Sequence, residues 1–200
     1  AAQRVVAARA RVRAGLAQQG RALELGLLET IERALPADAI TCWDMTILAY
    51  WAAAHLRLHQ RQSFLYPLGS GTLGYAWPAA LGASVAHPDA TVLAVVGDGG
   101  VQYALAELGA AAAHGLRAKL LIVDDGGYGI LREYQRQDYE HTTAVELPGK
   151  DLCAIAAANG LPARAVTPDD FAAQLDWLLS CDGAGVLVLG AHLVAAAPTT

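Results

Sequence analysis

VLAVVGDGGVQYALAELGAAAAHGLRAKLLIVDDGGYGIL, residues Val92–Leu131, contains the pattern from which we predict the fold. The apolar run Val92–Val96 predicts a buried strand, Val101–His114 has the length and composition of a helix, and Leu120–Val123 predicts a second strand. A strand, a helix and a strand in this order form one β-α-β unit, in which the two strands run parallel. Their carboxyl ends therefore lie at the same edge of the sheet.

Each of the two predicted strands runs directly into an acidic, glycine-rich turn. Gly97-Asp98-Gly99-Gly100 follows the first strand, and Asp124-Asp125-Gly126-Gly127 follows the second. Open parallel sheets bind their ligands at the carboxyl ends of the strands. We therefore expect the two turns to lie side by side and to form a binding site.

The residues of these turns suit a metal ion and a phosphorylated ligand. Carboxylates such as Asp98 and Asp125 favour a hard cation like Mg²⁺, which substrate phosphates often help to ligate. Gly99 and Gly100 let the backbone approach an anion at the start of a helix. A cation held by the two acids would then clamp a diphosphate. The alternative is that Asp98 is a helix cap and Asp124-Asp125 an ordinary turn.

The rest of the chain continues the alternation of strands and helices. Further strands are predicted at Ala39–Trp43, Ser63–Leu68, Ala163–Val166 and Val186–Leu189, and a helix opening at Asp44 has Asp44 or Thr46 as its cap candidate. Alternating elements predict the α/β class. The expected fold is a doubly wound, mainly parallel six-stranded sheet with helices on both faces.

Three segments in this order resemble a known family. They are GTLGYAWPAALGA at Gly71–Ala83, GDGG at Gly97–Gly100 and GGYGILR at Gly126–Arg132. The chain resembles the cofactor-binding, C-terminal domain of the acetolactate synthase and 2-oxo acid decarboxylase superfamily, from about Leu27 to about Gly190. The resemblance implies that thiamine diphosphate and Mg²⁺ are the cofactors.

The resemblance also implies roles for individual residues. Asp98 and Asp125 would bind the metal by their side chains and Gly127 by its backbone carbonyl. The backbone carbonyl of Gly71 would accept a hydrogen bond from the aminopyrimidine ring of the cofactor. The side chain of Leu73 would lie between the two cofactor rings. The full implied set of cofactor-binding residues is Gly71, Thr72, Leu73, Asp98, Gly99, Gly100, Asp125, Gly127, Tyr128, Gly129 and Ile130.

The chain departs from the family pattern at two places. Asp124 and Asp125 stand where the family usually has asparagine, so an extra negative charge lies beside the diphosphate. We expect metal binding to survive and Asp125→Asn to keep or strengthen cofactor affinity. Leu131 stands where decarboxylases similar to pyruvate decarboxylase place a glutamate. This favours carboligation, or a decarboxylase that uses another acid.

Two other functions compete with this interpretation. Gly69–Gly74 matches GxGxxG, which taken alone indicates a dinucleotide-binding domain. The preceding strand is not the first of the pattern, and no acid ends a strand about twenty residues later, which weakens this alternative. The second is a degenerate, non-catalytic assembly domain, suggested by the altered Asp124-Asp125 pair.

Composition limits the remaining classes. The 200 residues carry a net charge of -5, which does not suggest a nucleic-acid partner, and no apolar run is long enough to span a bilayer. The apolar content of 54% and the mean hydropathy of +0.31 suit a sheet buried on both faces. Cys42, Cys153 and Cys181 have no ligand spacing and indicate reduced thiols in the cytoplasm.

The expected organisation has three parts. Residues 1–22, which are rich in arginine, form a linker or the tail of a preceding domain; residues 23–190 form the cofactor-binding domain; and residues 191–200 form a C-terminal tail. In the family, a glutamate on a separate pyrimidine-type domain activates the cofactor. This chain has no matching glutamate. We therefore expect it to be inactive alone, to act on a 2-oxo acid with that domain present, and to form a dimer or tetramer.

Overall fold

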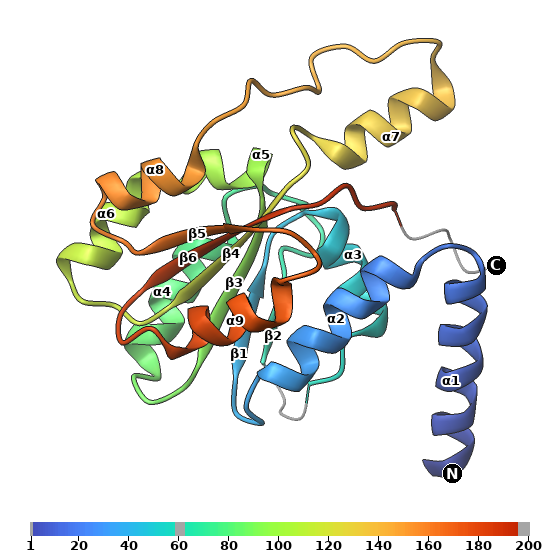
Figure 1. The fold of residues 1–200 in the computed structure, drawn as a ribbon, viewed down its shortest axis with the longest axis horizontal. Helices are drawn as coiled ribbons and strands as arrows, with labels where there is room; N and C mark the ends of the chain where they lie inside the picture. The colour runs from blue at the N-terminus through green and yellow to red at the C-terminus, as the bar shows by residue number, and fades with distance from the viewer. Residues whose placement is uncertain (1, 59–62, 196–200) are drawn as a thin grey trace.

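The computed structural model describes residues 2–58 and 63–195, and its elements alternate along the chain as expected (Figure 1). They are α1 (Ala2–Gln18), α2 (Ala22–Ala34), β1 (Ile40–Trp43), α3 (Ile47–His55), β2 (Phe64–Leu65), α4 (Ala76–Ala86), β3 (Val92–Gly97), α5 (Asp98–Val101), the 3₁₀ turn η1 (Gln102–Ala104), α6 (Ala106–Ala113), β4 (Lys119–Asp124), α7 (Gly129–Asp138), α8 (Leu152–Ala158), β5 (Ala163–Val166), α9 (Phe171–Ser180) and β6 (Gly185–Gly190).

The described strands form one six-stranded sheet in the order β2-β1-β3-β4-β6-β5. Every neighbouring pair is parallel, and β3 and β4 lie next to each other with Val95 opposite Leu121 and Gly97 opposite Val123. These strands are apolar at successive positions because both faces of the sheet are covered. The predicted doubly wound, parallel six-stranded sheet is confirmed.

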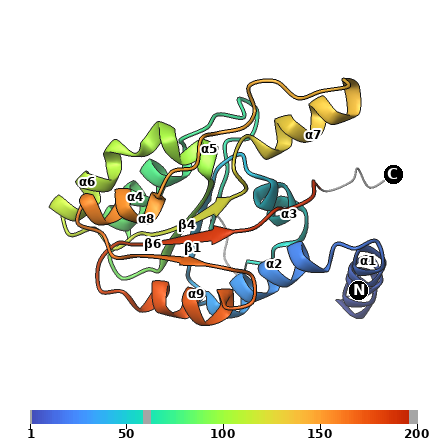
Figure 2. The ribbon, with the colours of Figure 1, turned by 45° about the horizontal axis from the view of Figure 1, so that its top comes forward.

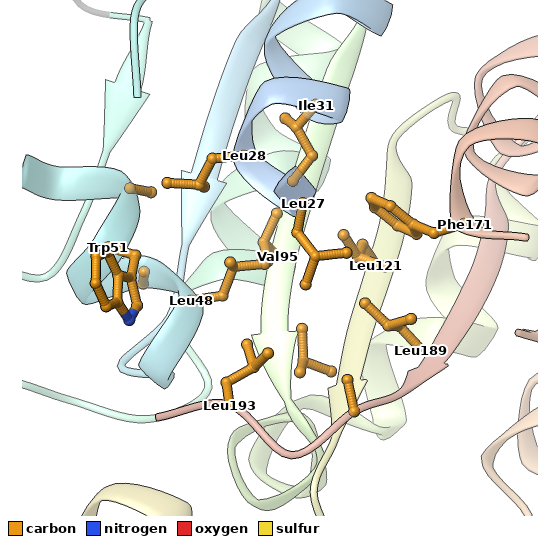
Figure 3. Packing of buried hydrophobic residues seen from close by; sticks show 14 of the residues in the cluster. Leu27, Leu28, Ile31, Leu48, Trp51, Val95, Leu121, Phe171, Leu189 and Leu193 are labelled. Atoms are coloured by element: carbon orange, nitrogen blue, oxygen red, sulfur yellow. The ribbon is translucent and has the colours of Figure 1, made fainter. Parts of the chain in front are cut away.

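Helices cover both faces of the sheet (Figure 2), and each face packs into its own apolar layer. Because successive side chains of a strand point to opposite faces, Val95 and Leu121 pack on the side of α2, α3 and α9, whereas Ala94 and Leu120 pack on the side of α4, α6 and α8. Figure 3 shows the first layer, in which Phe171 and the side chains of α2 and α3 meet over the central strands.

Three predicted elements differ from the structure. The single helix expected at Val101–His114 is divided into α5, η1 and α6, and it starts earlier, at Asp98. The helix expected from Asp44 begins at Ile47. The strand expected at Ser63–Leu68 is reduced to Phe64–Leu65, because β2 is an edge strand that pairs only with β1.

The two ends of the described chain pack on α2. Helix α1 lies at the edge of the molecule, where Arg13 pairs with Glu29 and Glu32 (Figure 1). At the other end, the backbone N–H of Val194 donates to Glu24, 2.8 Å away, and the Trp51 indole donates to the Val194 carbonyl at 2.7 Å. Ala191 and Leu193 thus join the core, while residues 196–200 lie outside the described residues. The three-part division of the chain stays a prediction.

Two further sequence expectations concern membranes and thiols. Among residues 2–58 and 63–195, no helix combines the length and the apolar character needed to cross a membrane. Cys42, Cys153 and Cys181 are free thiols. Cys42 is fully buried in β1, and burial raises its pKa to about 12, so it behaves as a small apolar side chain.

Candidate functional site

The candidate site lies at the carboxyl ends of the central strands. The strand order reverses between β1 and β3, because the chain places β2 on one side of β1 and continues with β3 on the other. In doubly wound sheets, this reversal opens the crevice that binds ligands. The turn after β3 and the turn after β4 flank each other at this edge, since Gly97 pairs with Val123. The predicted juxtaposition of the two turns is therefore confirmed.

A cavity of about 220 Å³ opens between these strand ends. All the predicted cofactor-binding residues except Thr72 line it, namely Gly71, Leu73, Asp98, Gly99, Gly100, Asp125, Gly127, Tyr128, Gly129 and Ile130. Thr72 is exposed beside it. Residues not assigned from the sequence complete the wall, and they are mainly apolar or aromatic: Met45, Thr46, Ile47, Tyr50, Gly97, Val123, Leu131 and Tyr134. The cofactor roles of the predicted set stay predictions.

Glycines form part of this cavity because side chains would collide there. A Cβ on Gly99 would lie 2.7 Å from ring carbons of Tyr128, and a Cβ on Gly100 would overlap the Asp44 carboxylate. The backbone of both glycines is consequently close to the cavity. A Cβ on Gly99 would also lie 3.5 Å from the carbonyl oxygen of Gly127, which shows that this carbonyl faces the first turn.

Asp98 opens α5 directly after β3 and is only 7% exposed. Burial, together with the negative charges of Asp125 and Asp124, raises the pKa of its carboxyl to about 6, although hydrogen bonds from the backbone N–H groups of Gly99 and Asp125 act in the opposite direction. A buried carboxylate that faces two other acids is costly without a cation. A bound metal ion would offset the repulsion between these carboxylates.

Asp125 contributes the second buried carboxylate. Its Oδ1 atom is buried without a hydrogen-bond partner, and the nearest cation, Nη1 of Arg132, is 3.9 Å away. Burial raises the pKa of Asp125, and Arg132 is the largest influence that lowers it. A buried oxygen without a hydrogen-bond partner is rare in a folded protein, and a bound ion is one way in which it can be satisfied.

These donors fit a hard divalent cation. In the described part of the chain, no three His, Cys, Asp or Glu side chains are grouped closely enough to hold a metal ion by themselves. The site therefore offers two carboxylates, Asp98 and Asp125, and the Gly127 carbonyl, and it leaves other positions for water and phosphate. Mg²⁺ is commonly bound in this way, by one or two carboxylates plus phosphate oxygens.

Asp44 has a function that the sequence analysis missed. It is fully buried after β1, and its carboxylate accepts from the backbone N–H of Gly74 at 2.9 Å and of Tyr75 at 3.2 Å. Of the two cap candidates, Thr46 occupies the N-cap position of α3, although its side chain makes no cap hydrogen bond, and Asp44 does not cap the helix. Asp44 instead fastens the loop that carries Leu73 to the central strands. Its position after a strand, like that of Asp98, is the signal that was overlooked.

The same contact argues against the dinucleotide alternative. A GxGxxG loop binds pyrophosphate through the N–H groups at the start of its helix. Here the N–H groups of Gly74 and Tyr75, at the start of α4, already donate to Asp44. The loop at 69–74 is thus closed by an internal carboxylate.

The segment after α7 pairs with the second acidic turn. The Tyr128 N–H donates to the Val145 carbonyl at 2.8 Å, and the Leu147 N–H donates to the Gly126 carbonyl at 3.0 Å. Between them, Gly127 and Glu146 form an isolated antiparallel bridge. The sequence analysis assigned no role to Glu146, because nothing local indicates a pairing over this distance.

Comparison with known proteins identifies the family. Residues 44–189 match the model of the thiamine pyrophosphate enzyme, C-terminal TPP binding domain. The chain belongs to this family, and the cofactor in the family's description is the one that the sequence resemblance implied.

Several relatives have similar sequences or structures. The acetolactate synthase isozyme 2 large subunit of Escherichia coli is 32% identical over 162 residues, which cover 78% of this chain and 29% of the relative. The benzoylformate decarboxylase of Pseudomonas aeruginosa is 31% identical over 160 residues, covering 78% of this chain and 30% of the relative. A thiamine diphosphate-dependent 4-hydroxybenzoylformate decarboxylase of Rhodococcus jostii has a similar structure, with a TM-score of 0.77 and 27% identity, covering 87% of this chain and 33% of that one. The chain thus spans about a third or less of each of these proteins.

Proposed function

We propose that this chain holds thiamine diphosphate through a Mg²⁺ ion bound by Asp98, Asp125 and the carbonyl of Gly127. It would act as the diphosphate-binding part of an enzyme that decarboxylates 2-oxo acids or joins them to a second substrate. The proposal extends the family membership, which concerns thiamine pyrophosphate binding, to a metal, a set of ligands and a reaction class.

One observation carries the proposal: a buried carboxylate oxygen of Asp125 that accepts no hydrogen bond, at the strand end next to Asp98. The pKa of Asp98 is raised to about 6 by burial and by the neighbouring acids, which supports the same conclusion. A divalent cation would satisfy the free oxygen and offset the repulsion between the two carboxylates. Neither a helix cap nor an ordinary turn accounts for both features.

Each part of the cavity has a task in this proposal. The two carboxylates and the Gly127 carbonyl bind the cation, and the backbone N–H groups of Gly99 and Gly100 face the diphosphate. Leu73 is half-buried in the cavity wall and supports the cofactor rings from the loop that Asp44 holds in place. When bound, thiamine diphosphate supplies the electron sink that decarboxylation requires.

The substrate and the partner are inferred from the family resemblance and from the relatives. The names of these relatives describe acetolactate synthases and decarboxylases of aromatic 2-oxo acids. Ile130 and Leu131 line the cavity at the start of α7 and provide no acid, which favours carboligation or another proton donor. A pyrimidine-type domain, on the same or a second polypeptide, would complete the site in a cytoplasmic dimer or tetramer.

Calorimetry tests the binding site. The chain is titrated with thiamine diphosphate in the presence of Mg²⁺, alone and with a pyrimidine-type domain supplied. We expect binding that requires Mg²⁺ and that Asp98→Ala abolishes, whereas Asp38→Ala, an exposed acid outside the cavity, preserves it. Absence of heat with the pyrimidine-type domain present would instead support a non-catalytic assembly domain.

An activity measurement tests whether catalysis requires a second, pyrimidine-type domain. We expect no decarboxylation of pyruvate by the 200 residues alone, because the activating glutamate of the family has no counterpart here. Turnover by this chain alone would show that the proposed requirement for a second domain is wrong.

A further inference from the structure

Arg132 is a buried cation that lies between the metal-site turn and the segment after α7. It is 8% exposed, and its guanidinium lies within ion-pair distance of two acids, Asp125 and Glu146. Its Nε and Nη2 atoms donate to the two carboxylate oxygens of Glu146, each at 2.7 Å. Its Nη1 lies 3.9 Å from Oδ1 of Asp125, and Nη2 lies 3.4 Å from the Asp125 carbonyl.

The local backbone brings Arg132 into this position. Arg132 is on the first turn of α7, and the helix begins two residues after Gly127. A Cβ on Gly127 would overlap the Val145 carbonyl oxygen and would lie 2.7 Å from Nη2 of Arg132, so glycine at this position lets both the paired backbone and the guanidinium approach the turn closely. The bridge between Gly127 and Glu146 then presents the second carboxylate.

The two acids differ in their access to water. The Glu146 side chain is 62% exposed, whereas the Asp125 side chain is 13% exposed. Water and salt screen the exposed charge of Glu146 more than the buried charges of Asp125 and Arg132. Glu146 therefore orients the guanidinium and offsets only part of its effect on the site.

The proposed site has a surplus of negative charge. Asp98, Asp124 and Asp125 all lie at the two strand ends, and a diphosphate adds further negative charge. We propose that Arg132 is the counter-charge of Asp125, a positioning residue that lets a carboxylate replace a neutral amide as metal ligand without repelling the diphosphate. This inference rests on the proposed function.

A purely structural role makes a different prediction. If Arg132 only ties α7 to the following segment through Glu146, losing either partner weakens binding of every ligand. If it is a counter-charge, its loss weakens binding of the anion but not of the cation, because a nearby positive charge repels Mg²⁺. Measuring the affinities for Mg²⁺ and for thiamine diphosphate separately thus distinguishes the two roles of Arg132. A structural role weakens both affinities, whereas a counter-charge role weakens only that for thiamine diphosphate.

Four proteins make the test: the wild-type chain, Arg132→Met, Glu146→Gln, and the double variant Arg132→Met/Asp125→Asn. Calorimetry measures the affinity for Mg²⁺ alone and then for thiamine diphosphate at saturating Mg²⁺, and circular dichroism checks folding. We expect Arg132→Met to weaken thiamine diphosphate binding about tenfold while Mg²⁺ alone binds as well or more tightly. Glu146→Gln should preserve both affinities within about threefold.

The double variant is the decisive control. It removes one positive and one negative charge, so the net charge of the site equals that of the wild type, and thiamine diphosphate affinity should recover to within about threefold. Equal losses for both ligands in Arg132→Met and Glu146→Gln, or no recovery in the double variant, would overturn the counter-charge. A wild-type chain that binds neither ligand would instead overturn the proposed function, and this inference with it.

Discussion

Replacement of Asp98 with asparagine is expected to stabilise the ligand-free chain at pH 7.5 and to abolish cation-dependent cofactor binding. The buried Asp98 carboxyl has a pKa of about 6 against an ordinary value of 3.8, because burial and the nearby acids disfavour its charge. At 1.36 kcal/mol per pKa unit, this difference corresponds to about 3 kcal/mol of unfolding free energy. The ionised Asp98 carboxylate therefore lowers the free energy of unfolding of the ligand-free chain. The proposed cation binding nevertheless requires this carboxylate.

The pH dependence has a defined sign. Because the pKa of Asp98 is higher in the folded state, the folded chain binds more protons than the unfolded chain between pH 3.8 and about 6. The contribution of Asp98 to stability consequently falls as pH rises through this window. Asparagine does not titrate, so the advantage of Asp98→Asn over the wild type should grow across the same window and level off above it.

Thermal unfolding monitored by circular dichroism at pH 4.5 and pH 7.5 measures this effect. For a domain of this size, about 3 kcal/mol corresponds to about 6–12 °C in Tm at pH 7.5. Adding Mg²⁺ and thiamine diphosphate should raise the Tm of the wild type but not of Asp98→Asn, since only a ligand-binding folded state is stabilised. Asp38→Asn, at an exposed position, is the matched control. A wild-type chain as stable as Asp98→Asn at pH 7.5 without ligands would refute the reasoning.

Two other substitutions test how the cavity is built. Asp44→Ala leaves the N–H groups of Gly74 and Tyr75 without their acceptor and should cost about 2–4 kcal/mol in urea unfolding, with weaker cofactor binding; an unchanged midpoint would contradict this role. Gly129→Ala places a Cβ against the Asp125 carboxylate, so this proposed metal-binding side chain must move. Calorimetry should show a Mg²⁺-dependent cofactor affinity that is lower by about tenfold or more. Its control, Gly26→Ala on the exposed side of α2, meets no atom within 4 Å and should raise stability by up to about 1 kcal/mol with binding unchanged.

The arrangement of the two turns could be predicted because it follows from local patterns. Apolar runs of strand length, separated by a helix, require parallel strands whose ends meet at one edge. Asp98 and Asp125 directly follow such runs, so their proximity needed no knowledge of the rest of the chain. The break of the expected helix at Gln102–Ala104 was not predictable, since the apolar spacing continues through it.

The parallel sheet and the acids at its carboxyl edge follow from the sequence alone, because each depends on residues close together along the chain. The partners of those acids are seen only in the folded structure. Asp44 meets Gly74 across 30 positions, and Arg132 meets Glu146 across 14, through loops whose paths leave no periodic signal. The physical reason is that hydrogen bonds and ion pairs between distant segments depend on how loops close over the sheet, which local patterning does not specify.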